Sequence, residues 1–228
     1  MDTHRDTFRS QQPRGYTLPE LLVSIAVFGI LTTMLIANFH RGSLADDLRV
    51  SSQTFAENLR TVQNLAMIGR SVLVGANTKV PPGGFGVSLP WISSKTYTLF
   101  ADTAIPQGTG CIMSDANNPN FQYDAGLGCD QTVDAGNVQF RPNIVIDAIK
   151  IDATQWVFGN GTWSPWGSSD PNNAIDIAFQ PPKPIPVADG LVGKTIQIEL
   201  RHLQTNQYRT ITIIGPSGQI SERFGRIQ

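Results

Sequence analysis

The most apolar part of the chain contains a single carboxylate. Of all the charged groups in the chain, this one most needs a compensating partner. Residues 18–39 read LPELLVSIAVFGILTTMLIANF, and Glu20 is the only charged side chain among them. An uncompensated charge in an apolar helix costs several kcal/mol. The positive end of the helix dipole offers one partner. A cut after Gly15 would provide another, because it would leave the free α-amino group of Tyr16 at the start of the helix.

The segment around Glu20 is long and apolar enough to cross a membrane. Its 22 residues would rise ~33 Å as an α-helix, about the hydrocarbon thickness of a bilayer. A secretory signal peptide is shorter and ends at a small-residue cleavage site, which is missing here. We therefore predict a retained anchor. A slight excess of arginine before the span predicts a cytoplasmic N-terminus. The flanking arginines are Arg5, Arg9 and Arg14 before it and Arg41 and Arg49 after it.

These residues together resemble the prepilin signature of type IV pilins and type II secretion pseudopilins. In that signature a basic leader, a glycine, an aromatic residue and a glutamate precede an apolar helix. By this resemblance Gly15 precedes the prepilin peptidase cut, Tyr16 is the N-methylated first mature residue, and Glu20 docks onto the amine of a neighbouring subunit. Pro19 departs from the usual aliphatic residue, and tyrosine replaces the commoner phenylalanine at position 16.

The resemblance implies a structural protein and no enzyme: a minor pilin or pseudopilin of a type II secretion pseudopilus or a type IV pilus. Such a chain is a single-pass protein of the inner membrane with an extracytoplasmic head, and it later enters a periplasmic or extracellular filament. Its partners would be other pilins, the prepilin peptidase, the assembly platform and, before assembly, membrane lipid. Residues 86–88 (Gly-Val-Ser) and 97–102 (Tyr-Thr-Leu-Phe-Ala-Asp) are similar to the minor pseudopilin H and FimT-like branch.

The remainder of the chain predicts a second half of the helix and a β-rich head. Beyond the span, apolar residues recur at steps of three, four and seven, which is typical of a helix with one face on a core. The stripe ends near Gly69, a suitable helix stop. We expect an α+β, pilin-like fold with a leader at 1–15, a membrane-spanning helix at 16–40, its amphipathic continuation at 41–69 and an antiparallel head at 70–228. The stripe consists of Leu44, Leu48, Phe55, Leu59, Val62 and Ala66.

In the head the apolar period shifts towards two, which is typical of short strands. The clearest pair is a hairpin turning at residues 204–207, because alternating apolar residues flank it on both sides. Strands are predicted near residues 72–75, 85–89, 96–100, 138–140, 144–146, 156–158, 175–179, 195–203, 208–214 and 219–222.

Two cysteines lie in the expected extracytoplasmic part. Cys111 and Cys129 are the only cysteines of the chain. They could form a loop disulfide, worth ~3 kcal/mol if unstrained, or remain two thiols in a reducing host. A zinc site is disfavoured, because the chain has no CxxC pair and no nearby histidine.

The stretch from Asp102 to Asp134 holds five acidic residues and no lysine or arginine. Oxygen-rich loops of this kind can bind calcium. However, an EF-hand-like loop starting at Asp115 would need an oxygen ligand where Pro119 stands and a glycine where Asn120 stands. We therefore expect a solvated acidic loop, with calcium as the alternative and no other cofactor. The oxygen-bearing residues are Asp102, Asp115, Asn117, Asn120, Asp124, Asp130 and Asp134.

Catalytic residues are scarce in the head. His202 is its only histidine, and no GxSxG, GxxxxGK[ST] or GxGxxG motif accompanies it. A Ser/His/Asp hydrolase is therefore disfavoured, and His202 is expected to be an exposed strand residue.

The C-terminal part of the head is basic, which raises an alternative function. The chain could be a FimT-like minor pilin that binds DNA during uptake, or a surface adhesin. The whole chain has a formal net charge of −1, which disfavours nucleic-acid binding through bulk charge. Five basic residues nevertheless outnumber two glutamates there, although such residues usually form a solvated face. They are Lys194, Arg201, Arg209, Arg223 and Arg226, with Glu199 and Glu222. Three tryptophans could stack on bases or sugar rings or pack in the core: Trp156, Trp163 and Trp166.

Overall fold

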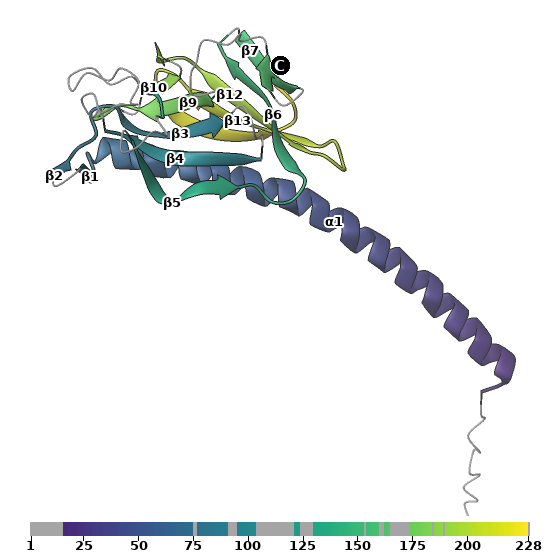
Figure 1. Ribbon diagram of the computed structural model, residues 1–228. Helices are drawn as coiled ribbons and strands as arrows, with labels where there is room; N and C mark the ends of the chain where they lie inside the picture. The colour runs from purple at the N-terminus through teal and green to yellow at the C-terminus, as the bar shows by residue number, and fades with distance from the viewer. Residues whose placement is uncertain are drawn as a thin grey trace, which may run out of the picture. The chain divides into compact units, whose positions relative to one another are not determined.

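The protein combines one long helix with an antiparallel β head, which confirms the predicted α+β, pilin-like arrangement (Figure 1). The computed structural model describes residues 16–74, 77–90, 95–103, 121–123, 130–152, 154–159, 162–164, 174–183, 185–188 and 190–227. The chain divides into two compact units, Met1–Ser43 and Leu44–Gln228. Helix α1 (Leu18–Met67) contributes residues to both. The finer four-part division of the sequence stays a prediction.

Helix α1 ends where the sequence predicted. Gly69 takes a left-handed conformation with φ +63°. Its N–H donates to the carbonyl of Ala66, and the N–H of Arg70 donates to the carbonyl of Leu65, both at 3.1 Å. These two bonds form a Schellman motif, which satisfies carbonyls that the last turn of a helix leaves open.

The second unit contains two six-stranded sheets, in which every recorded strand pair is antiparallel. The first is formed by β3 (Gly84–Pro90), β4 (Thr96–Asp102), β5 (Gln131–Gln139), β9 (Ala174–Phe179), β10 (Pro186–Ala188) and β11 (Leu191–Val192). The second is formed by β6 (Ile144–Ile151), β7 (Thr154–Gly159), β8 (Thr162–Ser164), β12 (Ile196–His202), β13 (Tyr208–Ile214) and β14 (Gln219–Phe224). Their strand orders are β11-β10-β9-β3-β4-β5 and β14-β13-β12-β6-β7-β8.

A separate hairpin of β1 (Val72–Val74) and β2 (Asn77–Lys79) lies next to the C-terminal end of α1 (Figure 1). Every strand predicted from the sequence is present. Four short strands were missed, because two or three residues are too few to display a period of two. They are β2, β8, β10 and β11.

The apolar stripe of α1 is buried as predicted except at its start, where Leu44 is only half-buried. Leu48, Phe55, Leu59, Val62 and Ala66 are within 1% of complete burial and belong to one core cluster with residues of both sheets. Burying such side chains contributes roughly 1.5–3 kcal/mol each for the larger ones. The second half of α1 is therefore an integral part of the head's core.

Polar side chains of α1 also reach both sheets. Asn58 donates to the hydroxyl of Tyr97 in β4 at 2.7 Å. Gln63 donates to the carbonyl of Gly218 at 2.7 Å, and Arg60 to that of Ile220 in β14 at 3.3 Å. β14 is the last strand of its sheet, so these bonds occupy carbonyls at an edge that would otherwise be open to strand pairing.

Tyr97 makes the head sensitive to alkaline pH. Burial raises its pKa to about 12, although the Asn58 hydrogen bond acts in the opposite direction. The folded phenol therefore keeps its proton where an unfolded tyrosine, with a pKa near 10, has lost it. The resulting stability is fully present below pH ~10 and is lost as the pH rises towards the folded pKa, by roughly 3 kcal/mol in all.

Tyr97→Phe should consequently lose less stability than the parent chain between pH 9 and 11.5 in denaturant unfolding. Tyr123, whose pKa burial also raises, is present in both chains and cancels in the comparison. Equal alkaline losses in the two chains would contradict the assignment to Tyr97.

Candidate functional site

The start of α1 provides a local partner for Glu20. The Glu20 carboxylate accepts the backbone N–H of Thr17 at 3.4 Å, and the carbonyl of Thr17 accepts the N–H of Leu21 at 3.1 Å. Thr17 is thus the N-cap and Glu20 the third helical residue, and the bond from the Thr17 N–H to the Glu20 carboxylate is one of the two bonds that define a capping box. Pro19 sits in the first turn, where no backbone N–H is needed. Sequence reasoning missed this role of Glu20, although the spacing Thr-x-x-Glu is its signal.

The first unit exposes an apolar surface along its helix. All residues from 16 to 36 are exposed, and Leu18–Ile36 is long and apolar enough to span a membrane. Three hydroxyl groups in this stretch donate to carbonyls of the preceding turn, which removes their need for water. These bonds are Ser24 to Glu20 at 2.8 Å, Thr32 to Phe28 at 2.7 Å and Thr33 to Ile30 at 2.8 Å. Such a surface requires lipid or other helices as its surroundings.

Comparison with known proteins identifies the same region. Residues 11–36 match the family described as the prokaryotic N-terminal methylation motif. The chain carries a type IV pilin-like prepilin signal. Neither the comparison with curated proteins nor the comparison with solved structures finds a match.

The prepilin signal indicates a substrate of the type IV pilin and pseudopilin pathway, a structural protein that interacts with a prepilin peptidase and with other pilins. With the apolar helix it fits a single-pass membrane-anchored protein. Gly15 lies outside the described residues, and Tyr16 is 83% exposed next to it. The cut after Gly15, the methylation of Tyr16 and the docking role of Glu20 stay predictions.

The expectation of a solvated acidic loop is wrong for Asp102. This residue ends β4 and is buried. Its carboxylate accepts the backbone N–H of Phe121 at 2.9 Å. Asp176 of β9, also buried, accepts the N–H of Tyr123 at 2.8 Å, and Asp130 accepts that of Thr103 at 3.0 Å. These carboxylates hold backbone segments on the sheet, which is why two of them are buried although charged.

The calcium and disulfide predictions fall mostly on residues that are not described. Asp115, Asn117, Asn120, Asp124, Cys111 and Cys129 all lie outside the described residues, and Asp134 lies in β5. Within the described part of the chain, no group of three or more His, Cys, Asp and Glu residues could hold a metal ion. Both predictions therefore stay open. The same holds for the tryptophans: Trp156 and Trp163 lie in β7 and β8, and Trp166 is outside the described residues.

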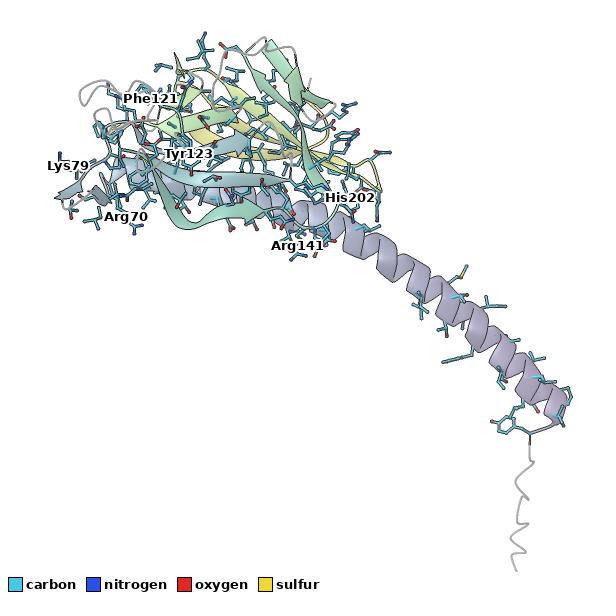
Figure 2. All side chains as sticks on the ribbon, in the orientation of Figure 1. Arg70, Lys79, Phe121, Tyr123, Arg141 and His202 are labelled. Atoms are coloured by element: carbon cyan, nitrogen blue, oxygen red, sulfur yellow. The ribbon has the colours of Figure 1, made fainter. Side chains whose placement is uncertain are left out.

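The prediction that His202 is exposed is also wrong, since its side chain is completely buried. His202 ends β12 at the opposite end of the second unit from Arg70 and Lys79 (Figure 2). Its Nδ1 accepts the backbone N–H groups of Gln204 and Thr205 at 3.3 and 3.2 Å. The imidazole therefore shapes the predicted β12–β13 turn, where Ser, Asn or Asp more often accept such bonds.

The basic C-terminal residues are largely neutralised by carboxylates. Lys194 pairs with Asp152 at 2.8 Å, Arg201 with Asp147 at 2.9 Å, and Arg209 with Glu222. Arg226 lies 3.4 Å from Glu199 and 3.6 Å from Asp147. Counting Asp147, Lys150 and Asp152 of β6 and its turn as well, six basic residues face four acidic ones, which lowers the local excess from +3 to +2. This pairing gives no support to the DNA-binding alternative.

Ionisation of Glu199 should lower the stability of the protein as the pH rises. This is the reverse of acid denaturation, in which stability falls as the pH is lowered. Burial raises its pKa, although the N–H of Ile227 and the charge of Arg226 lower it. The folded state therefore binds this proton more tightly than the unfolded state does, so the contribution of Glu199 to stability falls as the pH rises through the range above its ordinary pKa.

Glu199→Gln removes this ionisation. The free energy of unfolding of the variant, minus that of the parent chain, should increase with pH across that range. A denaturant titration at a series of pH values measures it, and a pH-independent difference would contradict the burial effect.

Proposed function

We propose that this chain is a minor pilin or pseudopilin that is cut after Gly15, N-methylated at Tyr16 and assembled into a filament through α1. The observation that carries the proposal is the match of residues 11–36 to the methylation motif. It is supported by the exposed apolar helix that follows directly. In a filament, neighbouring helices would cover this surface and replace the lipid.

The cut would also change the chemistry at the start of α1. A new amine at Tyr16 would stand one residue before Thr17, whose N–H already contacts the Glu20 carboxylate. In the apolar interior of the filament, the Glu20 carboxylate could then accept the Thr17 N–H at the helix start of its own chain, or pair with the α-amine of a neighbouring chain. Paired charges are the form in which ionised groups are tolerated in such surroundings.

The test is the intact mass and N-terminal sequence of the protein from membranes of a cell containing a prepilin peptidase. We expect a chain that begins at Tyr16 and carries one additional methyl group. Gly15→Val should remain at full length. Gly29→Ala is a suitable control, because a Cβ at position 29 would meet no atom within 4 Å. A full-length parent chain under these conditions would contradict the proposed processing.

Within the superfamily we propose the minor pseudopilin H and FimT-like branch. The support is sequence likeness at residues 86–88 and 97–102, which lie in the paired strands β3 and β4. Co-purification after crosslinking in cells tests it. Recovery with secretion pseudopilins would assign the chain to the pseudopilin H side of this branch and recovery with type IV pilins to its FimT-like side, whereas recovery with neither would contradict the proposal.

A further inference from the structure

The C-terminal segment is held across the outer face of the second sheet. β14 ends at Phe224, and the chain turns at Gly225, which has φ +115°. The N–H of Gly225 donates to the carbonyl of Tyr208 at 3.0 Å, and its own carbonyl accepts the hydroxyl of Thr210 at 2.8 Å. Thr210 is directly opposite Glu199 in the β12–β13 ladder, so the segment crosses the sheet beside that carboxylate.

Glu199 is the centre of this contact. This residue is only 1% exposed, and it lies at the point of β12 where the C-terminal segment crosses the sheet. One carboxylate oxygen accepts the backbone N–H of Ile227 at 2.7 Å, and the other lies 3.4 Å from Nε of Arg226. A buried carboxylate is stable only with such donors. The final residues therefore supply the groups that Glu199 needs.

A β-bulge brings a second carboxylate to the same place. In the β6–β12 ladder Glu199 is opposite Ala148, but the next residue, Leu200, is opposite Ile146. Asp147 is the extra residue, and bulges re-aim side chains in this way. Its carboxylate lies 3.6 Å from the Arg226 guanidinium and 2.9 Å from that of Arg201.

Besides the two carboxylates, an aromatic ring contacts Arg226. The guanidinium carbon of Arg226 lies 4.4 Å from the centre of the Tyr208 ring. A planar guanidinium can pair with carboxylates at its edge and stack on a ring with its face, which a lysine ammonium cannot do equally well. Two carboxylates and one ring therefore match arginine specifically.

We infer that Glu199, Asp147 and Tyr208 form a binding site for an arginine-bearing peptide segment, and that residues 225–227 of the chain itself are its exchangeable ligand. The guanidinium side chain of Arg226 remains 61% exposed, and residues 225–227 lie beyond Phe224, the last paired residue of β14, so this segment can leave without unpairing a strand. This inference stands independently of the proposed filament function.

The test removes the C-terminal segment from the chain and adds it back as a separate peptide. A chain ending at Phe224, purified in detergent with its N-terminal helix, is titrated with the acetylated peptide Gly-Arg-Ile-Gln. We expect saturable binding, an increase in Tm, and binding weaker by about tenfold for Gly-Lys-Ile-Gln. Glu199→Gln in the shortened chain should remove this preference, and the intact chain should bind the peptide at least about tenfold more weakly because its own tail competes.

Equal binding of the arginine and lysine peptides, or no binding to a folded shortened chain, would overturn the inference. If the shortened chain does not fold, hydrogen exchange in the intact chain tests whether the site recognises the guanidinium of Arg226. Hydrogen exchange at the Ile227 amide should accelerate by about tenfold in Arg226→Gln and less in Arg226→Lys. The same change at the exposed Arg70, Arg70→Gln, should leave it unaltered. An unchanged Ile227 amide in Arg226→Gln would show that the site does not recognise the guanidinium.

Discussion

Glu20→Gln is expected to exclude the protein from filaments even though α1 still begins normally. Glutamine retains an oxygen that can accept the Thr17 N–H, so this capping bond is preserved. It has no charge to pair with the α-amine of Tyr16 in the filament. Leaving one member of a buried pair without its partner costs about 3 kcal/mol, which corresponds to about a hundredfold loss. The measurement is the ratio of filament-bound to membrane-bound protein in a cell with the complete assembly machinery.

Two further variants separate charge from helix capping. Glu20→Ala removes both functions and should assemble no better than Glu20→Gln. Ser24→Ala, which removes only a hydroxyl bonded to the Glu20 carbonyl, should assemble like the parent chain. If Glu20→Gln assembled normally while Glu20→Ala did not, Glu20 would act through the capping bond alone and the docking role would be wrong.

Phe55→Ala is expected to destabilise the second unit by about 3–5 kcal/mol. Phe55 is completely buried on α1, and its ring packs edge-on against Tyr97 at 4.7 Å and Phe140 at 5.6 Å between ring centroids. Its truncation leaves a cavity between the helix and the sheet that rigid neighbours fill only in part. Because domains have a total stability of roughly 5–15 kcal/mol, this one change removes a large fraction.

Denaturant unfolding of the full chain in detergent measures this loss, with a signal from the β head. Met67→Ala is the matched control, because it shortens an apolar side chain on the same helix that is 40% exposed. It should change stability by less than ~0.5 kcal/mol. A Phe55→Ala loss as small as that of the control would mean that this part of α1 does not belong to the core.

Several elements could be predicted from the sequence because a local pattern suffices to specify them. The stripe through Leu48 and Phe55 has the period of a helix with one buried face, and Gly69 is suited to the left-handed residue that ends it. The β12–β13 hairpin follows from alternation on both sides of a short turn. The prepilin signal is equally local, since leader, glycine, aromatic residue, glutamate and span are contiguous.

The sequence by itself thus determined the type of each long element and the N-terminal signal that directs the chain. Only the tertiary structure decided the surroundings of individual polar side chains. Asp102 and His202 are buried because backbone N–H groups meet them, and Arg201 and Lys194 of the basic C-terminal part are paired with Asp147 and Asp152 of the neighbouring β6 strand and its turn. The physical reason is that alternation specifies which residues share a face of a strand, whereas charge and solvation depend on what distant parts of the chain bring to that face.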